Sequence, residues 1–599
     1  MTGASHDADV MIVGGGPVGL ALAGELAWRG NSVLLIEQTD GVIDHPKMDG
    51  IDLRVMEFCR RWGLVGEVKK YPFPKDYPQD MAYFTSLAGY ELGRESFASP
   101  SGGAETVRDG QSPETRVRCP QTFFDPILRR FAESFNSCEL RYLSRFASLA
   151  QDGDGVTVAY EDLRTNASRQ VRARYLVACD GANSTVRPAL GIAFEGPGGD
   201  SYSTSVMFRT ADLFSLHNKA PGYRNLFISE DGIWGQLSAI NGRDLWRAML
   251  LRGRERRASE EEIREGIRRI VGRDFDYEIL SVMHWARREL IASSYRTGRA
   301  FLAGDAAHAM SPTGGFGMNT GIKDAVDLAW KLDAILKGWG GEALLDSYTS
   351  ERRPVAIRAA REASGNWQRM QSPGKNPDLL DPDYRGALTR YHVGRRFAAT
   401  MLREWYKLGI DLGYIYSDSP ICCADDPDDA AREQTRKLSD DATADMPAAF
   451  FADGTPVTAA NLREWQRLRQ HLAEGTPIDP GWKELPAHEV MVYRQSSKPG
   501  ARAPHAWLAD GRSTLDWYGR GFVLLRIGAG APSADDFIFA ARGQGVPLEV
   551  VDCDEDPVAR VYRRPLVLVR PDGHVAWRGY DLPPGGAEQM LSRARGAMN

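Results

Sequence analysis

The first 40 residues place a glycine-rich turn between an apolar strand and a helix. The strand leads into Gly14-x-Gly16-x-x-Gly19, apolar residues at helical spacing follow, and a second apolar strand ends at Glu37. In such a βαβ unit, the three glycines allow a tight turn, the approach of a pyrophosphate and close helix packing. The pattern therefore predicts a dinucleotide-binding unit in an α/β fold, with Glu37 at the adenosine ribose.

A second glycine-rich loop, with the sequence GDAAHAMSPTGGFGMNTG, begins at Gly304. A short apolar strand precedes it, and a helical pattern continues to Leu336. Because the first N–H groups of a helix lack intrahelical partners, a glycine loop at this position can bind negative charge. Taken alone, the loop is equally well explained as an ordinary connection.

A third segment has a similar design. An apolar run of the buried parallel type ends in Asp180-Gly181, and Ser184 is placed to cap a short helix that has Arg187 in its first turns. This is another arrangement that can offer backbone N–H groups to an anion.

Residues 45–57 concentrate charge in one loop and helix start. They contain His45, Lys47, Asp49 and several further charged side chains, which is unusual for a spacer. Asp-Gly is also a common turn dipeptide, so an ordinary turn role for Asp49 is the alternative. Its position just after the predicted cofactor-binding strand favours a functional role.

The length of 599 residues indicates about two to four domains. Residues 200–290 contain mostly strands around one helical stretch, which predicts an inserted, mostly antiparallel sheet that walls a substrate site. From about residue 445, the order strand, helix, strand, hairpin, helix resembles a thioredoxin-like domain. Cys553 has no second cysteine nearby, so we expect no redox catalysis there.

Composition excludes several classes of function. The net charge is −6 with no basic patch, which argues against nucleic acid, and no run approaches the roughly 18 apolar residues of a membrane span. Seven cysteines without a C-x-x-C pair argue against a disulfide framework and a zinc site. We therefore expect a cytoplasmic protein without a metal, nucleic-acid or membrane partner.

Together, the three motifs resemble the signatures of single-component (group A) FAD-dependent aromatic hydroxylases. The likeness extends to Tyr348-x-x-Glu351-Arg352-x-Pro354, and the C-terminal part is similar to the phenol 2-monooxygenase and 3-hydroxybenzoate 4-hydroxylase branch. This resemblance implies four parts: a Rossmann-like FAD-binding domain of the glutathione reductase type (1–199 and 290–365), an inserted antiparallel-sheet substrate domain (200–289), a helical segment and linker (366–444), and a thioredoxin-like domain (445–599).

The resemblance also assigns roles to cofactor-binding residues. Glu37 would hold the adenosine ribose, Asp305 the ribityl chain, and the Asp180 motif both FAD and the nicotinamide cofactor. Gln121 and Arg118 resemble a helix start that contacts the ribityl chain, although Gln121 alone is equally well explained as a capping residue. The expected cofactor-binding set is Gly14, Gly16, Gly19, Glu37, Lys47, Arg118, Gln121, Asp180, Gly181, Arg187, Gly304, Asp305, Pro312, Gly315, Gly317, Met318 and Asn319.

Asp49-Gly50, followed by Arg54 and Glu57, resembles a stretch whose aspartate lies beside the substrate hydroxyl in that branch. Asp49 is therefore the first candidate for a catalytic base, and His45 is the alternative. The tyrosine that the branch usually has near the substrate is not evident, because the segment after Trp285 carries Arg287 and Arg288. We therefore place Arg287 in the expected catalytic set and expect a charged or larger phenolic substrate.

The implied activity is NADPH- or NADH-dependent hydroxylation of a phenol, ortho or para to its hydroxyl, by O₂ through a flavin C4a-hydroperoxide. A base that deprotonates the phenol would contribute a factor of roughly 10² to 10⁴, and the loop at 314–317 would stabilise negative charge on the flavin. A homodimer is expected by resemblance. The alternatives are an FAD-dependent reductase or dehydrogenase without oxygen transfer, and a binding protein that retains FAD.

Overall fold

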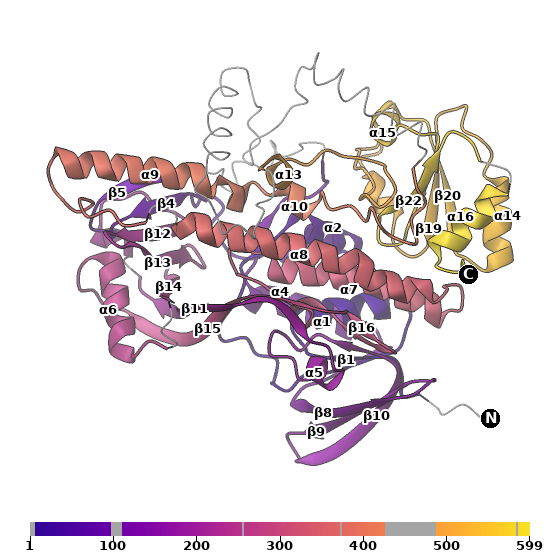
Figure 1. The fold of residues 1–599 in the computed structure, drawn as a ribbon, viewed down its shortest axis with the longest axis horizontal. Coiled ribbons are helices and arrows are strands. Elements are labelled where there is room, and N and C mark those ends of the chain that lie inside the picture. The colour runs from indigo at the N-terminus through magenta and orange to yellow at the C-terminus, as the bar shows by residue number, and fades with distance from the viewer. Residues whose placement is uncertain are drawn as a thin grey trace.

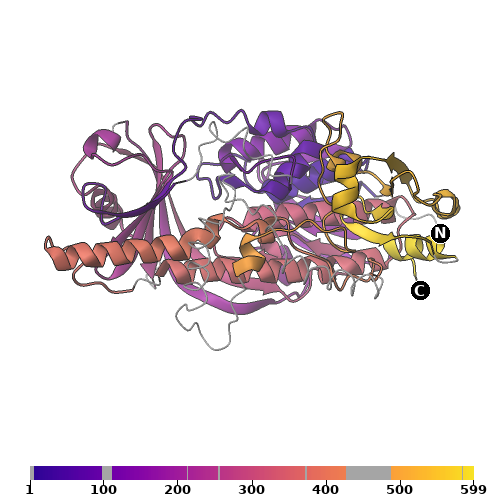
Figure 2. The same cartoon turned by 90° about the horizontal axis from the view of Figure 1, so that it is seen from above.

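The computed structural model describes residues 6–96, 111–211, 213–253, 257–371, 374–425, 487–582 and 585–598. Figure 1 shows an elongated molecule, with the C-terminal sheet near one end and the sheet that carries α6 (Glu260–Val271) near the other. The second view separates the same two ends (Figure 2). No helix in the described ranges is long and apolar enough to cross a membrane.

The first sheet forms the dinucleotide-binding unit. Its strands have the order β16-β17-β10-β1-β2-β7, and those from β17 to β7 are parallel. Helices α1 (Pro17–Trp28), α4 (Gln121–Glu133) and α7 (Gly317–Leu336) pack around this sheet. The strands are β1 (Ala8–Val13), β2 (Val33–Ile36), β7 (Cys138–Arg141), β10 (Ala167–Ala178), β16 (Arg296–Thr297) and β17 (Ala300–Leu302), with β8 (Ser144–Gln151) and β9 (Val156–Asp162) as an antiparallel extension of β10.

The second sheet has eight strands in the order β18-β15-β11-β14-β13-β12-β4-β5. Its pairings are antiparallel except between β12 and β4. Strands β4, β5 and β18 lie outside residues 200–289, which were predicted as the substrate domain. The bounds are β4 (Met81–Phe84), β5 (Glu91–Glu95), β11 (Phe194–Arg209), β12 (Arg224–Ser229), β13 (Gly232–Ala239), β14 (Leu245–Gly253), β15 (Glu278–Ala292) and β18 (His308–Ala309).

Alternation along these strands separates two faces of the second sheet. Trp246, Ala248 and Leu250 of β14 are buried against α6, whereas Arg247 and Met249 point to the opposite face. On that opposite face, α8 (Ala343–Gln371) and α9 (Tyr384–Trp405) cover part of β4 and β12. Helix α8 also covers β15 at Arg287, and the loop at His45 and Pro46 contacts Ser205 and Arg247 of the same face.

The C-terminal sheet has the thioredoxin-like order β20-β19-β21-β22, with β19 and β20 parallel and the other pairs antiparallel. Its core continues into α7, because Trp330 packs against Phe522 with ring centroids 6.2 Å apart. The elements are β19 (Phe522–Ile527), α14 (Asp535–Gln544), β20 (Leu548–Cys553), α15 (Asp556–Tyr562), β21 (Leu566–Val569), β22 (Val575–Gly579) and α16 (Gly586–Ala594). The predicted order of these elements is confirmed, and α15 is an additional helix.

In the chain, two long helices lie between the FAD-binding sheet and the C-terminal domain. Helix α8 begins at Ala343, contains the Tyr348 motif and keeps Pro354 in its interior, with Tyr348 among its buried side chains. Helix α9 lies in the predicted helical segment and is one continuous helix. Residues 426–444 of that segment, and residues 445–486 of the predicted thioredoxin-like domain, lie outside the described residues. Asp425, at the end of a described range, pairs with Arg578 at 2.6 Å.

Candidate functional site

The glycine turn before α1 forms an open cradle. Gly14 has φ +110°, and a Cβ there would lie 2.4 Å from the carbonyl oxygen of Cys179, while a Cβ on Gly19 would lie 2.0 Å from that of Gly14. A Cβ on Gly16 would meet nothing within 4 Å, and no side chain caps the helix that begins there. Unpaired helix N–H groups beside open space fit a pyrophosphate.

Glu37 closes the other side of this turn. One carboxylate oxygen accepts a hydrogen bond from the backbone N–H of Gly15 at 2.7 Å, and the other accepts one from the N–H of Thr39 at 2.8 Å. Glu37 therefore fixes the glycine turn from the end of β2, which is where the adenosine ribose would lie. The ribose contact itself stays a prediction.

The second glycine loop packs directly against the first. A Cβ on Gly304 would lie 3.0 Å from Val18, and one on Gly317 would lie 3.5 Å from Oδ1 of Asp305. The side chain of Asp305 is exposed although Gly304 and Ala306 beside it are buried. An exposed carboxylate between the two loops fits a hydroxyl-rich ribityl chain.

Asp324 of α7 holds this second loop from behind. Its carboxylate accepts hydrogen bonds from the Gly304 N–H at 3.2 Å and from Arg352 at 2.8 Å, and it contacts His308 at 2.6 Å. Burial opposes the charge of Asp324, but His308 and Arg352 keep its pKa below the usual value. This contact explains why His308 and Arg352 belong to the recognised motifs although neither lines the cradle.

The Asp180 motif lies beside Gly14. Asp180 accepts hydrogen bonds from the backbone N–H groups of Thr185 and Val186, and Ser184 accepts one from Arg187, as the sequence predicted. The Arg187 guanidinium lies over the Phe194 ring, 3.7 Å from its centroid, and donates to the Ile192 carbonyl. Asp180 therefore shapes the turn, and its role with Gly181 and Arg187 toward cofactors stays a prediction.

Asn319 joins the loop of Asp49 to the second glycine loop. Its amide donates to the carbonyl oxygens of Gly50 at 3.2 Å and Gly315 at 2.8 Å, and its Oδ1 accepts from the Asp52 N–H at 3.0 Å. Gly315 in turn donates to the carbonyl of Pro312 at 3.1 Å. Met318 is half-buried against the core of the FAD-binding unit. The structure therefore brings together the residues expected to surround the flavin ring.

Lys47 and Gln121 meet on the other side of the Asp49 loop. The backbone N–H of Lys47 donates to Oε1 of Gln121 at 3.1 Å, and the Gln121 amide donates to Asp125 at 3.0 Å. Burial raises the pKa of Asp125 to about 7, against the opposing effect of this hydrogen bond. Gln121 makes no helix-capping hydrogen bond, so the capping alternative is wrong.

Asp49 lies within a cluster of cations at the edge of the second sheet. Tyr223 donates its hydroxyl hydrogen to Asp49, Arg247 lies 3.4 Å from one carboxylate oxygen, and Arg118 lies 3.9 Å from the other. Burial opposes ionisation of Asp49, but Arg247, Arg118, the Tyr223 hydrogen bond and Arg224 hold its pKa below the usual range. Asp49 is therefore an anion at neutral pH.

Two expectations change at this cluster. A tyrosine does lie beside Asp49: it is Tyr223, which precedes β12 rather than following Trp285. Arg118, expected at the ribityl chain, instead lies over the Tyr223 ring, 3.2 Å from its centroid, and donates to Gln79. Neither Tyr223 nor Arg247 was predicted as a site residue. For Arg247 the sequence does contain an indication, because a charged residue stands between the apolar residues of an alternating strand.

His45 lies between two serine hydroxyls. Its Nδ1 is 2.9 Å from Ser281 and its Nε2 is 2.9 Å from Ser205. Burial, followed by the charges of Arg247 and Lys47, lowers its pKa to about 4. His45 is therefore neutral at physiological pH, and both of its ring nitrogens are already engaged.

Arg287 does not contact Asp49 or His45. It lies farther along β15, is 7% exposed, and has its guanidinium 3.2 Å from the centroid of the Trp367 ring. Arg287 therefore lies apart from the two candidate bases, and its place in the catalytic set stays a prediction. The side chain is nevertheless on the same face of the sheet as Ser281, because both residues occupy alternating positions of one strand.

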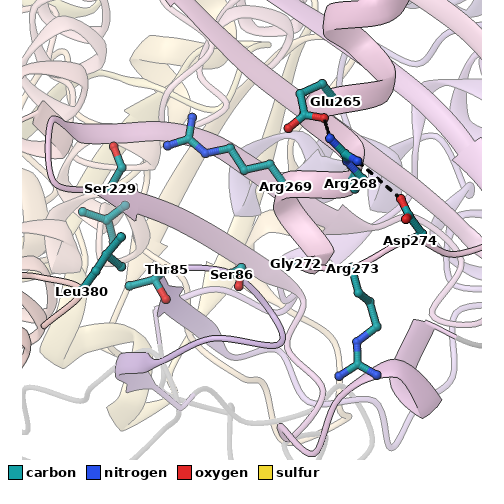
Figure 3. Close-up of a pocket in the computed structure, with 11 residues that line it drawn as sticks. Thr85, Ser86, Ser229, Glu265, Arg268, Arg269, Gly272, Arg273, Asp274 and Leu380 are labelled. Carbon is teal, nitrogen blue, oxygen red and sulfur yellow. Dashed lines mark hydrogen bonds and ion pairs between the residues drawn. The ribbon is translucent and has the colours of Figure 1, made fainter. Parts of the chain in front are cut away.

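A surface hollow of about 460 Å³ lies elsewhere, beside the C-terminal end of α6. Figure 3 shows Arg268 between Glu265 and Asp274, with Thr85 and Ser86 on a neighbouring segment. Arg269 covers the Trp234 ring at 4.0 Å. The hollow shares no residue with the cradle or with the Asp49 cluster.

Comparisons with known proteins agree with this geometry. Residues 7–363 match the FAD binding domain family, and residues 496–597 match the C-terminal domain of aromatic-ring hydroxylases. The chain is 32% identical to 4-methyl-5-nitrocatechol 5-monooxygenase of a Burkholderia species, over 96% of this chain and 94% of the relative. It is 31% identical to tetracenomycin B2 monooxygenase-dioxygenase of Streptomyces olivaceus, over 98% of each.

Among solved structures, the rebeccamycin biosynthetic enzyme RebC with reduced flavin superimposes with a TM-score of 0.83 at 37% identity, covering 99% of this chain and all of that one. The matches extend over the cradle, the second sheet and the C-terminal sheet together. FAD is thus the cofactor of the matched domain, and the open space at Gly16 fits it, while the contacts of Gly16 and Asp305 with FAD stay predictions. The chain belongs to the family of FAD-dependent aromatic-ring monooxygenases that carry a thioredoxin-like C-terminal domain.

Proposed function

We propose that this protein hydroxylates a phenolic ring, ortho or para to an existing hydroxyl, with NADPH or NADH as reductant. The chain would hold FAD, whose reduced form would activate O₂: one oxygen atom would enter the ring, the other would leave as water, and NADPH or NADH would supply the two electrons. The observation that carries the proposal is the Asp49 cluster, which places an anion, a tyrosine hydroxyl and two arginines beside the loop that Asn319 joins to the flavin site.

The cluster is suited to binding a phenol as its anion. Arg118 and Arg247 carry two positive charges against the single negative charge of Asp49, while Arg224 is paired with Glu404 at 2.5 Å. The excess positive charge lowers the pKa of a nearby phenol, because opposite charge favours the ionised form. A phenolate ring is richer in electrons at its ortho and para carbons, and these are the carbons that accept an electrophilic oxygen.

Asp49 orients the substrate hydroxyl in this proposal. It accepts a hydrogen bond from that hydroxyl while Tyr223 holds the carboxylate in place, and the released proton passes to solvent by way of the partly exposed Asp49 carboxylate. His45 is the weaker candidate, because its nitrogens are held by Ser281 and Ser205. Its neutral ring would shape the site instead.

Several large, partly buried side chains support a substrate larger than a single ring. Met249 pairs across the strands with Ser205, which pairs with Met283, so the three share the face next to Arg247. Methionine side chains adapt to flat aromatic surfaces. The similarity to tetracenomycin B2 monooxygenase-dioxygenase and RebC supports the same substrate class.

The rival proposal is a reductase or dehydrogenase on the same fold. The Asp49 cluster favours hydroxylation, since transfer of a hydride requires no stabilised phenolate. A homodimer stays a prediction from resemblance, which size-exclusion chromatography with light scattering would test.

The deciding experiment measures NADPH oxidation, O₂ uptake and product mass for the FAD-loaded protein. The panel contains simple phenols, hydroxybenzoates and fused-ring phenols. We expect a fused-ring phenol to accelerate NADPH oxidation and to gain one oxygen atom. Flavin reduction without oxygen transfer to any compound in the panel would move the reductase ahead.

A further inference from the structure

Arg287 is a buried cation without a counter-ion among the residues that the structure describes. It is 7% exposed, and burial alone lowers its pKa to about 9, so the guanidinium remains charged at neutral pH. Its Nη1 donates to the Ser201 hydroxyl at 2.8 Å, and its Nε has no described hydrogen-bond partner. Glu289, the nearest carboxylate along the strand, is engaged by Ser364.

Such an arrangement is costly in a folded protein. Burying an ion without a partner costs several kcal/mol even after relaxation, so buried charges are normally paired. The faces of Trp367 and Trp285 offset part of this cost, with ring centroids 3.2 and 5.5 Å from the guanidinium. Aromatic faces leave the hydrogen-bonding edge of a guanidinium free for an anion.

The strand register places Arg287 on the same face as the Asp49 cluster. Across β11 and β15, Ser281 pairs with Met207, and Arg287 pairs with Ser201, without a register shift between them. Met207 also pairs with Arg247 of β14, which contacts Asp49. We call this surface the site face: Arg247, Met249, Met207, Ser205, Ser281, Met283, Trp285 and Arg287.

The separation along the site face limits what can reach both ends. Arg287 lies six residues beyond Ser281, which corresponds to about 20 Å of strand at roughly 3.3 Å per residue. A single benzene ring cannot extend from Asp49 to a guanidinium at that distance, even with the reach of the arginine side chain. A fused-ring system with a substituent can.

The second glycine loop lies beside the Arg287 end. Trp367, on which Arg287 lies, follows Asn366 in α8, and a Cβ on Gly314 would lie 3.0 Å from the Asn366 amide nitrogen. A ligand between Asp49 and Arg287 would therefore pass the loop that is expected to hold the flavin ring.

We propose that Arg287 binds a carboxylate of the aromatic substrate, at the end of the site face opposite Asp49. The substrate class is then a fused-ring phenol that carries a carboxylate on a ring distant from the reacting one. The inference rests on the proposed function, because it assumes that the site face binds the aromatic substrate. A planar guanidinium matches a carboxylate through two parallel hydrogen bonds.

A matched pair of ligands tests the inference independently of turnover. The acid probe is 4,5-dihydroxyanthraquinone-2-carboxylic acid, and the neutral probe is its 2-carboxamide. Binding to the FAD-loaded protein is followed by the change in flavin absorbance. For the wild type, we expect the acid to bind at least tenfold more tightly than the amide.

Arg287→Gln should weaken binding of the acid at least tenfold and change that of the amide less than twofold. The affinity of Arg287→Lys for the acid should lie between those of the wild type and Arg287→Gln. Arg243→Gln, at an exposed position, should bind both probes as the wild type does. Equal affinities of the wild type for both probes, equal losses for both in Arg287→Gln, or no binding of either probe would overturn the proposal.

Thermal unfolding of the ligand-free protein separates binding from a structural role. Arg287→Gln removes an unpaired buried charge, so its Tm should equal or exceed that of the wild type, and a fall of several degrees would overturn the proposal. The mass of the product distinguishes failure of the carboxylate site from failure of the proposed function. If both probes gain an oxygen atom and neither depends on Arg287, the protein is a hydroxylase and the carboxylate site is refuted. If the acid binds through Arg287 but never gains oxygen, the carboxylate site stands and the proposed hydroxylation is refuted.

Discussion

Two opposing effects meet on the carboxylate of Asp49. Burial favours the neutral acid, whereas Arg247, Arg118 and the Tyr223 hydroxyl favour the anion, and the cations prevail. A carboxylate with a lowered pKa is a weak base, so Asp49 cannot act simply by holding the proton. Asp49 is better explained as the residue that orients the phenol, while the arginines promote its ionisation.

Asp49→Asn should reduce hydroxylation by a factor of roughly 10² to 10⁴, the range of general acid–base assistance. Because the pKa of Asp49 lies below its usual value, its anion is lost only as pH falls through that lowered value. The wild type should therefore lose no hydroxylation activity through protonation of Asp49 between pH 6 and 9. The variant should regain activity as pH rises toward the substrate's own pKa, near 10 for a simple phenol.

The measurement is the rate of product formation across this pH range, with NADPH reduction of the flavin in the variant as the control. Retention of wild-type hydroxylation by Asp49→Asn would contradict the assignment. So would a variant whose activity falls, rather than rises, on the alkaline side.

Gly16 and Gly19 differ in what an added methyl group would meet. In Gly19→Ala, the Cβ would lie 2.0 Å from the Gly14 carbonyl oxygen, so the turn must shift and the apoprotein should lose stability. In Gly16→Ala, the Cβ meets open space, so the apoprotein should stay within about 1 kcal/mol of the wild type while FAD binding weakens. Urea unfolding of the apoproteins and titration with FAD test the two variants. A destabilised Gly16→Ala apoprotein would refute the conclusion that the space beside Gly16 is open.

Helix α2 (Leu53–Arg61) connects the Asp49 loop to the C-terminal domain. The Glu57 carboxylate accepts two hydrogen bonds from Arg502, one of them at 2.5 Å, and a third from Arg54 at 2.8 Å. Arg54 also donates to the carbonyl of Asp572 at 2.7 Å. Arg54 and Glu57 of the recognised motif therefore hold the C-terminal domain rather than the substrate.

Arg502→Met should destabilise the protein by about 3–5 kcal/mol, because it leaves the Glu57 charge buried with one partner fewer. Arg512→Met provides the matched control, since its ion pair with Asp510 is exposed and should contribute less than about 1 kcal/mol. The free energies of unfolding in urea measure both. Similar free energies of unfolding for the two variants would show that the contact between Arg502 and Glu57 does not stabilise the protein.

The sequence predicted elements better than it predicted contacts between elements. Alternating and glycine-rich patterns indicated the cradle, α6 and the order of the C-terminal strands, because these depend on local periodicity. Tyr223 reaches Asp49, 174 positions away, through the pairing of distant strands, and no local pattern encodes that pairing. The same reason explains why the sequence did not indicate that Arg118 lies over the Tyr223 ring.

At the scale of the whole molecule, a buried polar network joins the FAD cradle to the C-terminal domain. Asp324 binds Gly304 and Arg352, and Arg352 donates to the Tyr416 hydroxyl at 3.1 Å. The Tyr416 ring lies 5.2 Å from the guanidinium of Arg570. Arg570 comes from the C-terminal domain, so both ends of the chain contribute to one network.

Arg570 is the central cation of this network. It is fully buried and donates to Glu351 at 2.5 Å, to Asp572 at 2.7 Å and to Asp327 at 3.2 Å. Glu351 and Asp327 belong to α8 and α7, which pack against the FAD-binding sheet. Lys331 is the other cation that pairs with these two carboxylates, and it cannot balance both of them alone. Arg570 of the C-terminal domain thus binds buried carboxylates of both parts, Glu351 and Asp327 of the FAD-binding unit and Asp572 of its own domain.

This arrangement predicts that FAD release and unfolding of the C-terminal domain are one cooperative event. Arg570→Met should lower the free energy of unfolding by about 3–5 kcal/mol by leaving buried carboxylates unbalanced. It should also release FAD earlier in a urea titration. Flavin fluorescence and circular dichroism, recorded together, should give one midpoint for the wild type. The control is Arg560→Met at an exposed pair, which should shift neither signal. Two separate midpoints in the wild type would show that the domains unfold independently, despite the shared network.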